Sequence, residues 1–205
     1  MRWDRLFDDL EGQLEQELSA EELDRSAEEE RLRLGRLSLR DRLLAVHERA
    51  AGGDYSVSVQ LGSGEPLTLQ PSSFGRDWFA ADLVDGAPRR TASAVGVQCI
   101  VPLAAVGALL LTRAQVEASL TPLAADTGPR SLSARLTLPF VLRDLCRRRA
   151  GVDLRTSTGD VHGTIDRVGR DHLDLAVHEA GRPRRASAVV QYRVVPLDQL
   201  LLVRL

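Results

Sequence analysis

The chain has 205 residues, of which 43% are hydrophobic and 27% charged, with a formal net charge of −2. This composition is that of an ordinary globular protein, and the length allows one or two small domains with apolar cores. No run of about 18 apolar residues is present, which argues against a membrane span, and the acidic, amphipathic N-terminus is untypical of a signal peptide. We therefore expect a cytoplasmic protein without a membrane partner.

The charges are unevenly distributed along the chain. Residues 1–35 carry 12 Asp or Glu against 5 Arg, whereas residues 130–205 carry 8 against 14. All basic residues are arginine, because the chain contains neither lysine nor asparagine. The codons of both missing residues are AT-rich, so we interpret their absence as the mark of a GC-rich genome. The acidic arm fits docking on its own mildly basic body or the choice of a partner, and a solvated helix face is the simpler explanation.

Residues 1–35 predict an acidic helical arm. Ser19 begins the sequence Ser-Ala-Glu-Glu, a capping-box pattern, so we expect a new helix to start there. Upstream of it, apolar residues recur at spacings of four and three, as on one face of a helix. We expect this face to pack on the body of the chain, on a second copy or on another protein. It consists of Trp3, Phe7, Leu10 and Leu14.

Residues 36–111 and 131–205 repeat one another, with residues 112–130 as a linker. Four short motifs recur in the same order at offsets of 94 or 95 residues, which indicates a duplication. Upstream of them, residues 37–39 match residues 136–138 at an offset of 99. The four motifs are Gly-Arg-Asp (75–77 and 169–171), Pro-Arg-Arg (88–90 and 183–185), Ala-Ser-Ala-Val (92–95 and 186–189) and Val-Pro-Leu (101–103 and 195–197).

Each copy begins with a segment of helical length that we expect to end at a glycine, Gly52 or Gly151. After it the apolar residues alternate, as in half-buried strands. In the second copy the alternating residues are Val152 and Leu154; Val161, Gly163 and Ile165; Leu173 and Leu175; Ala188, Val190 and Tyr192; and 200–203. We predict an α+β protein of two tandem helix-plus-five-stranded antiparallel small β-barrels behind the arm. Closure into barrels would remove exposed sheet edges.

A helix followed by five strands, with these alternations and turn glycines, resembles Sm-like (Sm/LSm) or SH3-like small barrels. Sm-like proteins bind RNA through an Asp and an Asn in one loop and an Arg-Gly pair near the last strands. This chain has no Asn, and its last strands, QYRVVPLDQLLLV, hold no Arg-Gly, so uridine binding does not carry over. The whole chain also resembles uncharacterised proteins of high-GC Gram-positive bacteria. The residues that carry the Sm-like resemblance are Val152, Leu154, Gly159, Val161, Gly163, Ile165, Leu173 and Leu175.

The sequence holds no catalytic motif that we recognise: no phosphate-binding loop, no dinucleotide fingerprint and no nucleophile elbow. His162, His172 and His178 lie near several aspartates, as metal ligands would. The first copy, however, has Thr68 and Trp78 where the second has His162 and His172. We interpret the histidines as polar residues on solvated strand faces and expect no enzyme, no metal and no cofactor.

The candidate binding residues are arginines. A pair recurs in the loop before the fourth strand of each copy, and a triplet ends the second helix, where cations are also favoured by the helix dipole. Gathered on one face, they would contact phosphates in a salt-sensitive way. They are Arg89 and Arg90, Arg184 and Arg185, and Arg147, Arg148 and Arg149. We predict a non-enzymatic adaptor that binds a protein partner or associates with itself, and the alternative is an RNA- or DNA-binding regulator.

Overall fold

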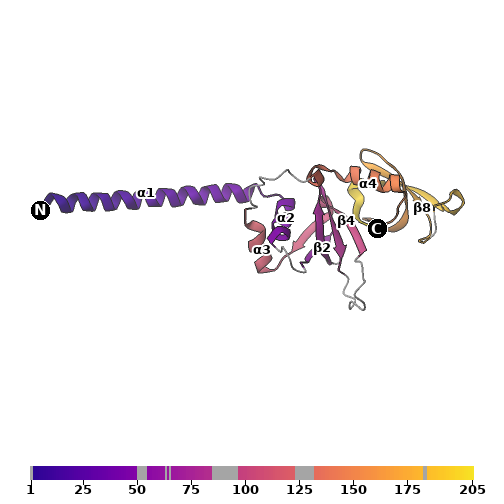
Figure 1. Cartoon of the computed structure of the whole chain (residues 1–205), viewed down its shortest axis with the longest axis horizontal. Helices are drawn as coiled ribbons and strands as arrows, with labels where there is room; N and C mark the ends of the chain where they lie inside the picture. Colours follow the sequence, from indigo (N-terminus) through magenta and orange to yellow (C-terminus); the bar gives the residue numbers. More distant parts are fainter. Residues whose placement is uncertain are drawn as a thin grey trace. The chain divides into compact units, whose positions relative to one another are not determined.

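The computed structural model describes residues 2–49, 55–62, 64, 66–84, 97–122, 132–181 and 184–205, with no account of the side chains of residues 2–17 and 20. The chain divides into two compact units, Met1–Ser38 and Leu39–Leu205. The first unit contains α1, one continuous helix over Arg2–Gly35 (Figure 1). The prediction that a new helix starts at Ser19 is therefore wrong. The surrounding Glu, Leu, Ala and Arg residues are good helix formers, and they continue the helix through the capping pattern.

The second unit contains two halves with the same order of elements, a helix followed by five strands. The first half is α2 (Leu39–Arg49), β1 (Val57–Leu61), β2 (Pro66–Phe74), β3 (Trp78–Leu83), β4 (Val97–Pro102), η1 (Leu103–Ala105) and β5 (Val106–Leu110). The helix α3 (Arg113–Leu120) and the short η2 (Leu132–Arg135) follow. The second half is α4 (Leu138–Arg148), β6 (Gly151–Thr156), β7 (Gly159–Val168), β8 (His172–Val177), η3 (Ala186–Ala188), β9 (Gln191–Pro196), η4 (Leu197–Gln199) and β10 (Leu200–Arg204).

The strands of the described residues form one ten-stranded antiparallel sheet, in the order β5-β1-β2-β3-β4-β10-β6-β7-β8-β9. The prediction of two tandem five-stranded barrels is wrong, because the sheet is continuous and not closed. Its last strand explains the difference: β10 pairs with β6 of its own half and with β4 of the first half. The edge that closure would have hidden is thus covered by a strand of the other half.

The two halves share irregularities as well as strand order. A β-bulge interrupts β2 between Pro71 and Ser73, and another interrupts β7 between Ile165 and Arg167, 94 residues later. A second pair of bulges lies where the last strand of each half meets the first, in β5–β1 and in β10–β6. Because a bulge bends and twists a strand locally, the two halves curve at the same places.

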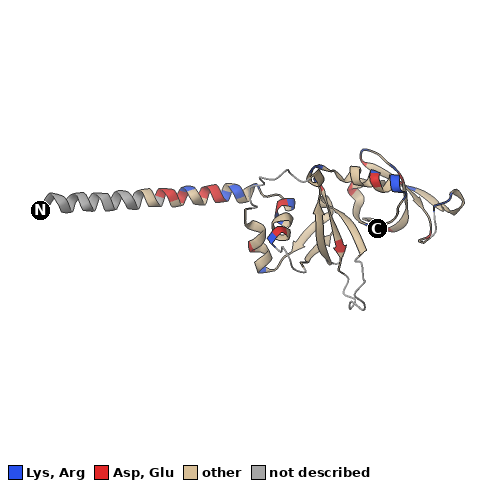
Figure 2. Ribbon diagram, viewed as in Figure 1, with Lys and Arg blue, Asp and Glu red and all other residues tan. Residues whose placement is uncertain are grey.

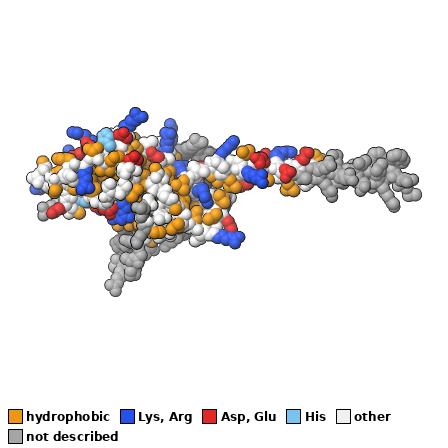
Figure 3. Space-filling view, turned by 180° about the vertical axis from the view of Figure 1, so that it is seen from behind, with side chains coloured by type: hydrophobic (Ala, Val, Ile, Leu, Met, Phe, Trp, Pro, Cys, Tyr) orange, Lys and Arg blue, Asp and Glu red, His pale blue; other side chains and the backbone are white. Residues whose placement is uncertain are grey.

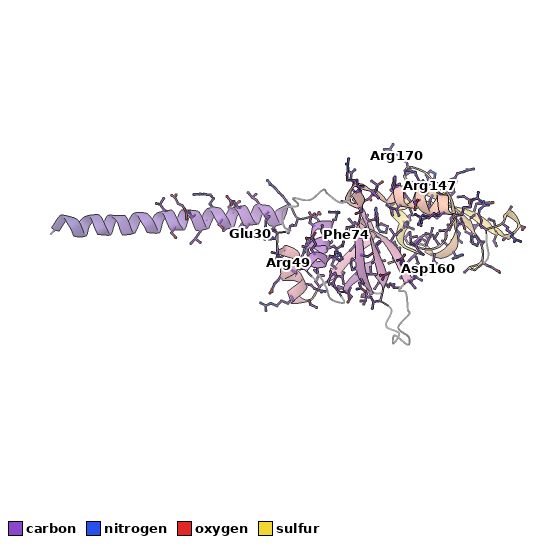
Figure 4. The ribbon with its side chains drawn as sticks, in the orientation of Figure 1. Glu30, Arg49, Phe74, Arg147, Asp160 and Arg170 are labelled. Carbon is purple, nitrogen blue, oxygen red and sulfur yellow. The ribbon has the colours of Figure 1, made fainter. Side chains whose placement is uncertain are left out.

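Each half buries one face of its helix in a core of its own. In the first half Leu43 of α2 packs among strand residues, and the ring of Phe74 lies 5.3 Å from His47 and 6.1 Å from Phe79 (Figure 4). The helix α3 lies beside α2 (Figure 1), where Arg42 donates hydrogen bonds to the buried Ser119 hydroxyl. In the second half α4 packs over β7, with Leu142 fully buried.

The two halves exchange side chains where β4 meets β10. Ile100 of β4 and Trp78 of β3 belong to the core of the second half, and Leu202 of β10 belongs to the core of the first. The Trp78 indole N–H donates to the Leu136 carbonyl (3.0 Å), and the Leu138 N–H donates to the Asp77 carboxylate (2.7 Å). Residues 39–205 therefore form a single packed body. We call the contact between its two halves, where β4 pairs with β10, the internal junction.

The helix α4 ends at a different residue from the one predicted. Arg149, not Gly151, takes the left-handed conformation (φ 50°), and its N–H donates to the carbonyl of Cys146 at 3.0 Å. Gly151 is instead the first residue of β6. The counterpart, Gly52, lies outside the described residues.

Candidate functional site

Only one of the two duplicated arginine pairs is described, since Arg89 and Arg90 lie outside the described residues. Arg184 donates to the Asp166 carboxylate at 2.6 Å, with both side chains about three-quarters buried. The hydrogen bond to Asp166 raises the pKa of the Arg184 guanidinium. Arg185 is exposed. One arginine of this pair is thus held in an ion pair within its own half.

The arginine triplet is also partly paired. Arg147 and Arg148 each donate to the Asp144 carboxylate at 2.6 Å, one helical turn earlier on α4. The hydrogen bond from Arg148, followed by that from Arg147, holds the pKa of Asp144 below its usual value. Such exposed pairs on one helix contribute little to stability, but they offset part of the positive charge offered to a phosphate.

The structure brings three of the predicted arginines together. A pocket of about 330 Å³ lies between the end of α4 and β7. One of its lining residues, Arg147, is labelled in Figure 4. Arg148 and Arg185 do not line it. Asp166 also lines this pocket and forms an ion pair with Arg184, so its carboxylate offsets one of the pocket's positive charges. The lining residues are Cys146, Arg147, Arg149, Ile165, Asp166 and Arg184.

The predicted partner-binding face of the arm lies in α1, but the side chains of Trp3, Phe7, Leu10 and Leu14 lie outside the described residues. Further along the helix, acidic and basic residues recur (Figure 2), and four leucines between them are exposed. Arg33 and Glu30 form an i,i+3 ion pair at 2.6 Å, and this hydrogen bond lowers the pKa of Glu30. The exposed leucines are Leu18, Leu23, Leu32 and Leu34.

An exposed apolar strand lies at one edge of the sheet. β9 pairs with β8 on one side, and no described strand pairs with it on the other. Tyr192 and Val194 of β9 are 62% and 67% exposed, and their alternation places them on one face of this edge. Val190, immediately before the strand, is 81% exposed. Orange apolar side chains are visible on the surface of residues 39–205 in Figure 3. The free backbone N–H and C=O groups of an edge strand are a template for strand pairing, and large exposed apolar side chains favour its burial.

Sequence reasoning missed this edge as a site. It assigned Val190 and Tyr192 to the fourth strand of a closed barrel, where one strand face would be buried. The sequence carried little signal for it, because residues 190–194 alternate between apolar and polar, as a barrel strand with one buried face would. Alternation shows that one face is apolar, but it does not show whether the core covers that face or leaves it exposed.

The three histidines of the second half lie in hydrogen bonds. His178 is buried, with its ring nitrogens 2.9 Å from the Thr164 hydroxyl and 3.0 Å from the Glu179 carbonyl. His162 contacts Asp153 at 2.7 Å, and its ring meets His178 edge-on at 5.2 Å. His172 contacts Asp171 at 2.8 Å and lowers the pKa of that carboxyl. Among the described residues no cluster of three or more His, Cys, Asp or Glu is arranged to hold a metal ion.

Comparison with known proteins adds no assignment: no protein-family model, no curated protein and no solved structure matches this chain. The resemblance to Sm-like proteins therefore stays a prediction. Within the part of the chain that the structure describes, no helix is both long and apolar enough to cross a membrane. The surfaces themselves, the β9 edge and the arginine-lined pocket, are the basis for assigning a function.

Proposed function

We propose that this chain is a non-enzymatic adaptor that binds a protein partner through the open edge at β9. The observation that carries the proposal is the exposure of Tyr192 and Val194 on one face of β9, a strand that has no described partner on its outer side. Burying such side chains contributes about 25 cal/mol per Å² of apolar surface, which favours association. The aromatic Tyr192 suits a protein interface, where tyrosine is enriched.

The backbone of β9 supports binding by strand addition. At the internal junction the Leu205 N–H donates to the Gln98 carbonyl at 2.9 Å, so Gln98 and, two residues on, Ile100 direct their backbone groups toward β10. Tyr192 and Val194 are the equivalent residues of β9 at the offset of 94. We expect their N–H and C=O groups to point outward at the open edge, where a partner strand would pair with them.

Site-specific photo-crosslinking tests this proposal. A benzophenone side chain replaces Tyr192 in one variant and Phe140, an exposed aromatic residue of α4, in the matched control. We expect the probe at position 192 to capture a protein of defined mass in cells, and the added substitution Val194→Glu to abolish the capture. Identical capture patterns from the two probe positions would overturn the proposal.

The pocket between α4 and β7 favours a second candidate function, binding of RNA or DNA phosphates by Arg147, Arg149 and Arg184. This candidate is the weaker one, because Asp144 and Asp166 already pair with two of these arginines. Filter binding at low and moderate salt measures it. Phosphate contacts predict binding at low salt that falls steeply as salt rises and that Arg149→Ala weakens. Absence of binding at low salt would exclude this candidate.

We place this binding in the cytoplasm. Cys99 and Cys146 are both free thiols, which fits a reducing compartment. Burial raises the pKa of the Cys99 thiol to about 11, which makes it an inert side chain of the first core.

A further inference from the structure

We infer that the partner of β9 is β5 of a second copy of this chain, docked as β10 docks on β4 at the internal junction. The inference rests on the proposed function, because it names the partner of the same edge. Its basis is the duplication: the strand order β5-β1-β2-β3-β4 recurs as β10-β6-β7-β8-β9. At the internal junction β4, the last strand of the first order, pairs with β10, the first strand of the second order. Among the described strands, the same two positions, β9 and β5, have no partner at the ends of the sheet.

The residues at the two open edges are exposed where their counterparts at the internal junction are buried. Ile100 of β4 is 4% exposed beneath the second half, whereas Val194, its counterpart on β9, is 67% exposed. Across the junction, Leu138 of α4 is 5% exposed, whereas Leu39, its counterpart on α2, is 36% exposed. Both sides of the missing contact therefore carry uncovered apolar residues at matching positions.

The internal junction also gives the register of the proposed contact. Val203 pairs with Ile100, and Arg204 pairs with Cys99. At the offset of 94 these pairs become Leu109 with Val194 and Leu110 with Arg193. The hydrogen bond from Leu205 to Gln98 makes Arg204–Cys99 a non-hydrogen-bonded pair, in which side chains lie closest. Leu110 and Arg193 should therefore be the nearest pair of side chains across the new contact.

A groove beside β9 offers room for the neighbour's helix. Its volume is about 620 Å³, and residues 77 and 102–104 of the first half and the start of α4 line one side of it. Asp171, His172 and Val194 line the side next to β9. At the internal junction the equivalent residues are occupied: Asp77 accepts from the first N–H of α4, and Trp78 is buried against Leu136. By the same geometry Asp171 would accept from the Leu39 N–H at the start of α2 in the next copy.

This contact joins two different surfaces, so it is head-to-tail and not two-fold symmetric. Each copy keeps one open β9 and one open β5, and copies add in a closed ring or an open chain. The outer contact is less apolar than the internal junction, with His172 in place of Trp78 and Gly107 in place of Leu201. We therefore expect association that is reversible and depends on concentration.

Disulfide trapping tests the register. One full-length chain carries Arg193→Cys and another Leu110→Cys, both with Cys146→Ala, while the buried Cys99 is kept. We expect the mixture to form a heterodimer linked between positions 110 and 193, identified by peptide mass. The parent chain alone, and Arg193→Cys mixed with Val106→Cys, about 13 Å further along β5, should not. Equal linking of Arg193→Cys with itself, or with Val106→Cys, would overturn the inference.

Light scattering on the unmodified chain gives an independent measurement. We expect a mass above the 22.4 kDa of one chain that increases with concentration. Val194→Glu should weaken the association about ten-fold or more, because it buries a charge at the contact, and Phe140→Glu should leave it unchanged. A constant mass of one chain would overturn the inference. If the benzophenone probe at position 192 then still captured a different protein, the proposed function would stand without the further inference. If the probe captured nothing, the proposed function and the further inference would both fail.

Discussion

At position 163 the backbone of a neighbouring strand excludes any side chain. A Cβ added to Gly163 would lie 2.4 Å from the Ala176 carbonyl oxygen and 3.0 Å from its carbon. A backbone group in a paired strand cannot move aside as a flexible side chain does. We expect Gly163→Ala to lower the free energy of unfolding by about 1–3 kcal/mol, the range of an overpacked core, as measured by urea denaturation.

Gly151→Ala is the matched control for this prediction. It lies in the neighbouring strand β6, and a Cβ there would meet only the His162 ring at 3.7 Å, an ordinary contact. We expect a change in the free energy of unfolding within about 0.5 kcal/mol. Equal destabilisation by the two substitutions would contradict the steric explanation.

Single residues also show what the sequence could say about the candidate site. Repetition of Pro-Arg-Arg and the run Arg147–Arg149 identified arginines that the structure does bring to one pocket. Of the two ion pairs that these arginines form with aspartates, only one could be predicted from the sequence. Asp144 is one helical turn from Arg147, so that pair follows from helical spacing. Asp166 is 18 residues from Arg184, and only the fold places them together.

At the scale of elements, periodicity located the secondary structure but not its partners. The residues predicted to alternate at 152–154, 161–165 and 173–175 lie in β6, β7 and β8. The fourth strand was placed too early, because residues 186–188 form a 3-10 turn before β9. Alternation shows which residues share a strand face, and it contains no information on which strand lies beside which.

The error in the fold class follows from that limit. A sheet edge must be covered, and closure within each copy was one way to cover it. The structure uses another: β10 lies between β4 and β6, so the copies cover one edge of each other. A sequence with two equivalent copies supports either arrangement, because the same apolar residues on the fourth and fifth strands face a neighbour in both.

For the whole molecule, the shared strand β10 implies that residues 39–205 unfold together. Leu202 lies in the last strand of the second half, yet its fully buried side chain belongs to the core of the first. Leu200 and Val203 of the same strand belong to the core of the second half. A disturbance at β10 therefore reaches both cores, although the sequence places this strand at the C-terminal end of the chain.

We expect Leu202→Ala to destabilise both halves, by about 2–5 kcal/mol, as the removal of a large buried side chain does. Hydrogen exchange followed by mass spectrometry in low urea measures each half separately. Amides of β2 and β3 in the first half and of β7 and β8 in the second should lose protection to a similar extent, because they open in one cooperative unit. Leu205→Ala, at an exposed residue next to β10, should leave the amide protection of both halves unchanged. Faster exchange confined to one half would show that the two halves unfold independently, and the continuous sheet would then not act as one body.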